Sequence, residues 1–245
     1  MGQDVEFVQP TVKSGAVSVG NVSALNRPSP VVSEKLVQSD SCALEPIEIT
    51  KPIEISQFSE MLIRAVDVTG SLFLFLLMTP VILFTVLLVK LTSYGPVLYR
   101  QQRVGKAGKI FVLYKFRTMV DGAEKHTGPV LAAKDDGRVT PVGRILRCTR
   151  IDELPQLFNV IRGDMSLVGP RPERPFFVSR HTALRGVRLT VKPGITGLAQ
   201  IRAFYDLKPE HKLKYDSLYI QNRSLLLNLL ILLQTIPVIF LKKGW

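Results

Sequence analysis

The sequence predicts a membrane-associated α+β protein that is mostly helical and has a small β element. Residues 68–89 form a run of 22 residues without a charged side chain, most of them Leu, Phe, Val and Ile, which is long enough for a membrane helix. The part that follows combines one stretch of strand-like alternation with several helix start and stop signals. A third observation, the distribution of charge, separates this part from the N-terminal region.

Positive charge is concentrated after the apolar run. The 245-residue chain has a formal net charge of +12, and residues 90–245 alone carry 27 basic and 11 acidic side chains. Such a basic region indicates an anionic partner, which is a phosphate compound, a nucleic acid or the face of an anionic membrane. The two cysteines and three histidines show no metal-ligand spacing, which argues against a zinc site and a disulfide framework.

The N-terminal region, residues 1–57, is predicted to be a disordered polar tail. It is rich in Ser, Val and Pro, and no helical apolar period runs through it. The sequence Pro-Ile-Glu-Ile occurs at residues 46–49 and again at 52–55. Each proline removes a backbone donor and favours an extended chain, so we interpret this segment as a linker.

Two interpretations of the apolar run stay open on physical grounds. As a straight helix its 22 residues would be about 33 Å long and would cross the bilayer once. Thr79-Pro80 lies at the midpoint, where proline breaks the hydrogen-bond ladder and the Thr79 hydroxyl could bond the freed Leu76 carbonyl, lowering the cost of a sharp kink. That kink would allow a re-entrant hairpin, although the length slightly favours the straight span.

Both ends of the basic region are predicted to contact the membrane. Lys90 opens a run of basic residues that extends to Arg117, and the positive-inside bias places this region on the cytoplasmic side. Residues 225–241 form a second apolar stretch, at the short limit for a span. Asn228 and Thr235 share one helix face there, which favours an amphipathic helix in the membrane interface over the alternative of a buried core helix.

The basic region itself mixes strand and helix signals. Residues 111–119 alternate in a way that would place Lys115 and Arg117 on one face of a strand. Thr140-Pro141 predicts a helix start, and the arginines that follow at steps of three residues predict a basic ridge on that helix. These ridge residues are Arg144, Arg147 and Arg150.

The next helix is predicted to begin at Pro155 and to end at Gly163. Its apolar side chains are expected to form the buried side. They are Leu157, Phe158, Val160 and Ile161.

Asp152-Glu153 is the candidate catalytic pair. It lies between the arginine ridge and the helix that begins at Pro155, in a region with few carboxylates. Basic groups and a helix N-terminus favour ionised carboxylates and attract phosphate oxygens. An ionised Asp152 could attack phosphorus while Glu153 holds Mg²⁺. The simpler alternative is an ion pair of Asp152 with Arg147 or Arg150.

Two further segments stand out. Residues 163–172, Gly-Asp-Met-Ser-Leu-Val-Gly-Pro-Arg-Pro, place Arg171 between two prolines. The prolines restrict its backbone and suit bidentate phosphate recognition, although a rigid structural turn would need the same residues. Residues 192–200, Lys-Pro-Gly-Ile-Thr-Gly-Leu-Ala-Gln, are glycine-rich but match no nucleotide-binding fingerprint.

These motifs together resemble the bacterial sugar transferase family, the monotopic phosphoglycosyl transferases. The resemblance covers residues 61–241 and includes Tyr-Lys-Phe-Arg-Thr-Met at 114–119 and Asp-Glu-Leu-Pro-Gln at 152–156 with Asn159. The chain resembles the short catalytic-core form, because a polar tail stands where longer relatives have several spans. Leu198 departs from the family, which often has tryptophan there.

The resemblance implies an enzyme that transfers a sugar 1-phosphate from a nucleotide diphosphosugar, commonly a UDP-sugar, to polyprenyl (undecaprenyl) phosphate, with release of UMP. This step initiates exopolysaccharide or glycoconjugate synthesis at the cytoplasmic face of the bacterial inner membrane. In family terms Asp152 forms a phosphosugar-aspartyl intermediate and Glu153 ligates Mg²⁺. The family also implies that the break at Thr79 and Pro80 makes a re-entrant helix, against the slight preference for a span.

The resemblance also implies a set of binding residues. Arg147 and Arg171 match positions that contact substrate phosphates, and Lys115 and Asp216 match further motif positions. Electrostatics adds Arg117, Arg144 and Arg150 as candidate phosphate-binding residues.

The expected organisation is a tail (1–57), a re-entrant membrane helix (58–90) and a cytoplasmic-face catalytic domain (91–245). The expected partners are the UDP-sugar, polyprenyl phosphate and cytoplasmic membrane lipids, with no nucleic acid, and a homodimer stays open. The competing hypothesis is a non-catalytic, membrane-anchored basic module that binds anionic lipid or nucleic acid. That hypothesis leaves the motifs unexplained.

Overall fold

The computed structural model describes residues 55–124, 128, 130, 136–202 and 208–240. Nearly all of the predicted tail, with both copies of its repeat up to residue 54, lies outside the described residues. The helices and strands, with η for a 3-10 helix, are α1 (Gln57–Thr92), β1 (Leu98–Val104), η3 (Lys106–Gly108), β2 (Ile110–Phe116), α2 (Pro141–Thr149), η4 (Ile151–Glu153), α3 (Gln156–Arg162), β3 (Ser166–Val168), α4 (Pro175–Arg180), η5 (Thr182–Leu184), η6 (Gly186–Thr190), β4 (Gly194–Thr196), α5 (Leu198–Arg202), α6 (Pro209–Gln221) and α7 (Leu225–Phe240).

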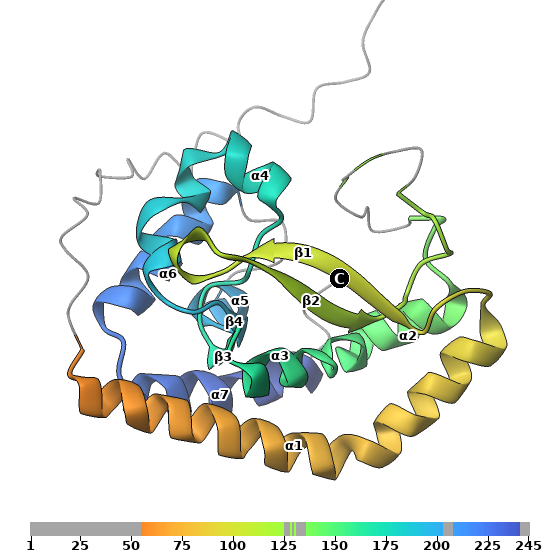
Figure 1. Cartoon of the computed structure of the whole chain (residues 1–245), viewed down its shortest axis with the longest axis horizontal. Coiled ribbons are helices and arrows are strands. Elements are labelled where there is room, and N and C mark those ends of the chain that lie inside the picture. The colour runs from red at the N-terminus through yellow and green to blue at the C-terminus, as the bar shows by residue number, and fades with distance from the viewer. Residues whose placement is uncertain (1–54, 125–127, 129, 131–135, 203–207, 241–245) are drawn as a thin grey trace, which may run out of the picture. The chain divides into compact units, whose positions relative to one another are not determined.

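Helices dominate, and the strands of the described residues form two small sheets, which confirms the α+β prediction. β1 and β2 are an antiparallel hairpin whose register sets Tyr99 opposite Lys115. β3 and β4 pair in parallel, with Ser166 opposite Gly194. In Figure 1 the hairpin crosses the middle of the view, with α3, α7 and α1 below it.

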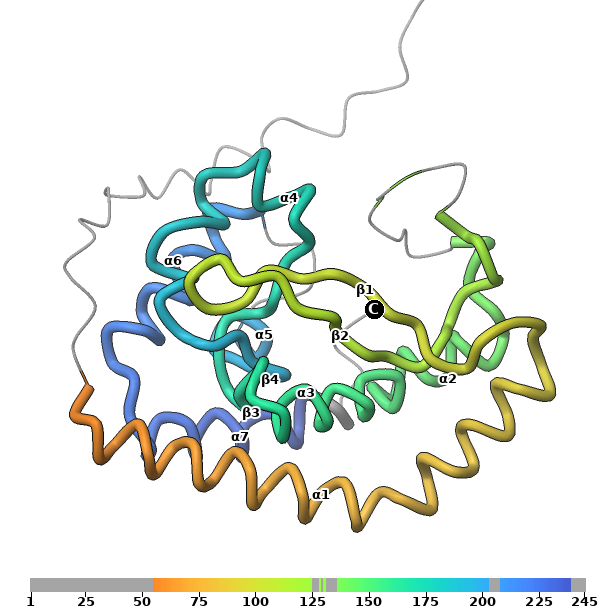
Figure 2. Tube along the Cα trace, viewed as in Figure 1, coloured from red at the N-terminus to blue at the C-terminus, as the bar shows by residue number. Residues whose placement is uncertain are grey.

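The apolar run lies within α1, a 36-residue helix that is long and apolar enough to cross a membrane. It begins at Ser56, whose hydroxyl accepts a hydrogen bond from the Ser59 amide at 3.3 Å. The helix continues through Pro80 and curves along its length, as Figure 2 shows. The Thr79 hydroxyl donates to the Phe75 carbonyl at 2.9 Å. The expected bond to Leu76 was therefore wrong: of the carbonyls three and four residues before Thr79, the hydroxyl bonds the one four residues before it.

Polar residues in the first turns of α1 attach this helix to the rest of the protein. Arg64 donates to the Val160 and Ile161 carbonyls at 2.7 and 2.9 Å, which satisfies carbonyls at the end of α3. The buried Asp67 carboxylate accepts from the Ser166 hydroxyl at 3.0 Å and from the Leu167 amide at 2.9 Å. The N-terminal third of α1 is therefore packed against α3 and β3.

Helix α7 buries Asn228 and Ile231 and exposes several of its leucines. Asn228 accepts from the Tyr219 hydroxyl at 2.9 Å, and the Thr235 and Thr196 hydroxyls are 2.8 Å apart. Leu226 and Leu233 are more than 60% exposed. Asn228 and Thr235 do share a face, as predicted, but that face contacts protein. A helix with this outward face suits an apolar medium and argues against the buried core helix.

Two apolar clusters hold the segment between α2 and β3 in place. The smaller consists of Val89, Phe116 and Leu146 and joins α1 and α2 to the hairpin. Phe158 of α3 is 50% exposed, so its predicted burial was wrong. Its ring packs edge-on against Tyr114, with centroids 5.9 Å apart. The larger cluster joins β2, α3, β3, α6 and α7 and includes Phe111, Leu113, Leu157, Val160, Met165, Leu167, Tyr219 and Ile231.

Candidate active site

Asp152 and Glu153 lie in the short turn η4, between α2 and α3. Thr140 caps α2 as predicted, by accepting a hydrogen bond from the Gly143 amide at 2.9 Å. The chain leaves α2 through Arg150, a non-glycine residue in the left-handed region at φ 60° and ψ 10°. Such a conformation costs energy and is found at functional sites. This turn gives the two carboxylates their direction.

Gly143 lets α2 approach the hairpin at backbone contact. A Cβ atom at this position would lie 2.0 Å from the Thr118 carbonyl oxygen. The same carbonyl accepts from the Thr140 amide at 3.0 Å. No residue with a side chain fits here without moving α2, so glycine sets the distance between the α2 helix and the end of β2.

Glu153 joins two segments that are far apart in the sequence. Its Oε1 atom accepts from Lys115 Nζ of β2 at 3.0 Å and from Arg171 Nη2 at 2.7 Å. Arg171 lies in the segment that follows β3, between Pro170 and Pro172. The structure therefore brings Lys115, Glu153 and Arg171 into direct contact.

The two carboxylates have opposite pKa shifts. Burial alone would raise the pKa of Glu153, but the charges of Arg171 and Lys115, with the Arg171 hydrogen bond, outweigh it and lower that pKa. Burial raises the pKa of Asp152 to about 6, against the opposing charge of Lys115. The surroundings therefore favour the ionised form of Glu153 and, relative to an ordinary aspartate, the neutral form of Asp152. Asp152 and Glu153 are 7% and 8% exposed.

The predicted arginine ridge is only partly formed. Arg147 donates from Nε to the Thr118 hydroxyl at 2.8 Å, and its charge acts on Asp152. The charge of Arg150 helps to lower the pKa of Glu153. Arg150 itself lies beyond α2, because that helix ends at Thr149. Arg144 is exposed on the surface of α2. The structure places Arg147 and Arg150 at the carboxylate pair and leaves Arg144 on the outer surface.

Arg117 bonds to Ser93 and not to the carboxylate pair. Its Nη2 atom donates to the Ser93 carbonyl at 2.8 Å and to the Ser93 hydroxyl at 2.6 Å. Lys115 and Arg117 were expected to project together, and in the structure their side chains contact different residues, Glu153 and Ser93. Arg117 instead ties the residue after α1 to the end of the hairpin.

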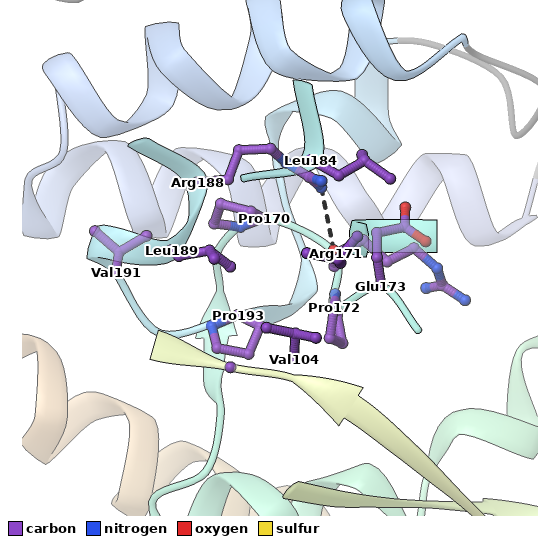
Figure 3. A pocket seen from close by; sticks show the side chains of 12 residues that line it. Val104, Pro170, Arg171, Pro172, Glu173, Leu184, Arg188, Leu189, Val191 and Pro193 are labelled. Atoms are coloured by element: carbon purple, nitrogen blue, oxygen red, sulfur yellow. Dashed lines mark hydrogen bonds between the residues drawn. The ribbon is translucent and has the colours of Figure 1, made fainter. Parts of the chain in front are cut away.

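Asp216 is connected to Arg171 through Arg188. Its carboxylate pairs with Arg188 Nε at 2.6 Å, and the side chains are 2% and 4% exposed. Arg188 Nη2 donates in turn to the Arg171 carbonyl at 3.2 Å, the dashed line in Figure 3. Sequence reasoning missed Arg188, and also Arg103 of β1, which donates to the Pro172 carbonyl at 2.8 Å. Neither belongs to a recognisable motif, so only the pairing of β1 with β2 or the contact with Asp216 could have indicated them.

The donor set of the carboxylate pair fits Mg²⁺ that is held jointly with a substrate. Among the described residues, no group of three or more His, Cys, Asp or Glu side chains could hold a metal alone. Mg²⁺ commonly binds one or two carboxylates and completes its shell with substrate phosphates and water. Asp152 and Glu153 supply such carboxylates beside four basic side chains that suit phosphate oxygens.

Comparison with known proteins agrees with the family resemblance of the motifs. The family described as bacterial sugar transferase matches residues 58–242. A UDP-N-acetylgalactosamine-undecaprenyl-phosphate N-acetylgalactosaminephosphotransferase of Aeromonas hydrophila is 44% identical over 187 residues, 74% of this chain and 44% of the relative. The uncharacterized sugar transferase EpsL of Bacillus subtilis is 42% identical over 181 residues, 74% of this chain and 88% of the relative. A UDP-glucose:undecaprenyl-phosphate glucose-1-phosphate transferase of Klebsiella pneumoniae is 42% identical over 74% of this chain and 40% of the relative. The chain thus spans less than half the length of the first and third of these.

Proposed function

Because this chain belongs to the bacterial sugar transferase family, we propose that it is a phosphoglycosyl transferase that moves a sugar 1-phosphate from a UDP-sugar to undecaprenyl phosphate. The observation that carries this proposal is the buried Asp152-Glu153 pair, with Lys115 and Arg171 on Glu153. Relatives that are named for such transfers use N-acetylgalactosamine, galactose or glucose. The activity would initiate synthesis of an exopolysaccharide or another glycoconjugate.

The proposed chemistry has two displacements at one phosphorus atom. A carboxylate oxygen of Asp152 attacks the β-phosphorus of the donor, and the bond from that phosphorus to the bridging oxygen breaks, so UMP leaves with the electron pair. An oxygen of the acceptor phosphate then attacks the phosphosugar-aspartyl phosphorus and breaks the aspartyl bond. The products are polyprenyl diphosphosugar and a regenerated Asp152 carboxylate.

The basic side chains would act on the phosphate groups. Arg171 and Arg147 would bind phosphate oxygens and orient them for the attack, and Lys115 and Arg150 would offset the negative charge that gathers there. Glu153, with Asp152, would hold Mg²⁺, which when bound neutralises charge on the reacting phosphates.

We further propose that α1 is re-entrant and that the domain lies on the cytoplasmic face of the inner membrane. The two ends of α1 contact the same folded unit: Asp67 accepts from β3, and Ser93 accepts from Arg117. A straight span would put these contacts on opposite sides of the bilayer. A helix that enters at one face and bends at Pro80 keeps both, and the outward apolar face of α7 would lie in the same leaflet.

UMP release by purified protein with Mg²⁺, undecaprenyl phosphate and a panel of UDP-sugars tests the function. We expect acceptor-dependent release with at least one sugar and its loss in Asp152→Asn. Glu210→Gln is the matched control, because it removes one negative charge from an exposed residue at the start of α6. Full turnover in Asp152→Asn would refute the nucleophile, and silence of the folded protein across the panel would favour the anionic-lipid module.

A further inference from the structure

The segment that carries Arg171 has few backbone groups with which to hold itself. Pro170 and Pro172 have no N–H, so carbonyl oxygens take a larger share in fixing the chain around Arg171, and the Pro170 carbonyl accepts from the Gly194 amide at 2.9 Å. A small cavity of about 10 Å³ lies against this segment and is lined by Pro170, Pro172, Arg188 and Leu184, among others (Figure 3). Apolar packing on that side is therefore incomplete.

Two guanidinium groups bind consecutive carbonyl oxygens of this segment. Arg103 Nη1 donates to the Pro172 carbonyl at 2.8 Å, and Arg188 Nη2 donates to the Arg171 carbonyl at 3.2 Å. The Val104 amide adds a bond to the Glu173 carbonyl at 3.0 Å. Figure 3 shows Arg188 reaching the Arg171 backbone while the Arg171 side chain extends away from it.

Each of the two guanidinium groups is itself fixed on its other side. Arg188 Nε pairs with the buried Asp216 carboxylate at 2.6 Å. Arg103 Nη2 donates to Gln101 Oε1 at 2.5 Å. A side chain that is held at both ends transmits a defined position to the carbonyl that it binds.

This arrangement of buried guanidinium groups is a poor way to stabilise the fold. Burial, and then the neighbouring charge of Arg171, lower the pKa of Arg103 to about 10. Like charges and buried ion pairs of this kind are poor sources of stability compared with apolar packing. Both guanidinium groups bind the backbone of the segment that carries Arg171, and the Arg171 side chain contacts Glu153.

We propose that Arg103 and Arg188 are positioning residues that hold the Arg171 backbone, so that its side chain meets Glu153 and the substrate phosphates. Asp216 acts through Arg188 in this device. The inference rests on the proposed function, because its main readout is turnover, and it assigns a role to residues that touch neither the carboxylate pair nor the reacting atoms.

A double-mutant cycle in kcat/KM tests the proposal. Arg188→Lys cannot keep both of its bonds, and we expect it to lower kcat/KM by about 10- to 100-fold, mainly through kcat. In an Arg171→Lys background the guanidinium group that Arg188 is proposed to position is already absent. There the same change should lower kcat/KM by less than about threefold. Equal factors in the two backgrounds would show that Arg188 contributes only to general stability and would overturn the proposal.

Arg223→Lys is the matched control. Arg223 also pairs with a carboxylate, that of Glu60, but this pair joins the segment after α6 to α1, and the Glu60 side chain is 43% exposed. Its effect should be the same in both backgrounds. If Arg188→Lys does not fold, Arg103→Lys carries the same cycle, because Arg103 holds the next carbonyl.

Amide hydrogen exchange keeps this inference separate from the proposed function. The Val104 amide, which bonds the Glu173 carbonyl, should exchange faster in Arg188→Lys than in the wild type and should be unchanged in Arg223→Lys. Unchanged exchange in Arg188→Lys would refute the positioning role. A wild-type protein without turnover but with this exchange pattern would refute the proposed function alone.

Discussion

Glu173 illustrates how single charges stabilise the segment next to the site. Its carboxylate accepts from Lys212 Nζ at 2.9 Å, and its side chain is 12% exposed. Burial alone would raise the pKa of Glu173, but the charge and hydrogen bond of Lys212, with the charges of Arg188 and Arg103, outweigh burial and lower it. A carboxyl group whose pKa is lower in the folded state stabilises the fold above its ordinary pKa, here 4.5.

We therefore predict that Glu173→Gln lowers the free energy of unfolding by about 1 to 3 kcal/mol near pH 7, the size of a hydrogen bond to a charged group. The difference from the wild type should shrink as the pH falls below 4.5, because the carboxyl group of the unfolded chain protonates first and that of the folded protein follows as the pH falls through its lowered pKa. Denaturant unfolding between pH 3.5 and 7 measures this, with the exposed Glu210→Gln as control. A difference that stayed constant with pH would contradict the assigned ion pair.

The sequence indicated the residues at the carboxylate pair better than those behind it. Lys115, Glu153 and Arg171 belong to motifs, so a family resemblance located them. Arg117 lies in a motif too, but its partner Ser93 belongs to none, and Arg188 lies outside the motifs altogether. The direction of such a side chain depends on how the elements pack, which alternation and charge do not contain.

At the scale of elements, α7 shows that an apolar sequence does not reveal which face is inward. Asn228 is buried and accepts from the Tyr219 hydroxyl, whose oxygen also lies 3.2 Å from the Val168 carbonyl oxygen. This contact connects α7 to α6 and β3. Ile231 of the same helix is also buried, so the inward polar bond and apolar burial together fix the rotation of the helix, with Leu226 and Leu233 outward.

Asn228→Leu is therefore predicted to destabilise the protein, although it makes α7 more apolar. Loss of a buried hydrogen-bond partner should cost about 1 to 3 kcal/mol. Thermal unfolding in detergent or nanodiscs measures the change. Gln234→Leu, an equivalent change at an exposed position of the same helix, should be close to neutral. Stabilisation by Asn228→Leu would mean that this face contacts lipid rather than protein.

Elements with local signals were predicted from the sequence, and those without them were not. Thr140 caps the start of α2 and Gly163 caps the end of α3. Each cap depends on residues close in the sequence, so these two bounds could be predicted. β3 and β4 are three residues each, and their pairing sets Ser166 against Gly194. That pairing depends on a crossover and on close backbone contact, such as the 2.1 Å that would separate a Cβ on Gly194 from the Gly169 amide nitrogen, and no local pattern encodes it.

At the scale of the whole molecule, the contacts of α1 support the proposal of a re-entrant helix. Near its start, Arg64 and Asp67 bond to α3 and β3. Just beyond its end, Ser93 accepts from Arg117. Length and charge alone favoured a straight span slightly, because neither contains these contacts. Breaking the hydrogen bonds at one end to allow a span would leave the Asp67 carboxylate without its partners.

We therefore predict that residues before α1 lie on the same side of the membrane as the catalytic domain. In a background with Cys42→Ser and Cys148→Ser, Ser14→Cys should resist an impermeant thiol reagent in intact cells and react after lysis. Ser179→Cys on α4 is the matched control for the domain itself and should behave identically, because a re-entrant helix returns the chain to the side from which it entered. Labelling of Ser14→Cys in intact cells, with Ser179→Cys still protected, would establish a full span and would mean that the contacts of Arg64 and Asp67 do not form in the membrane.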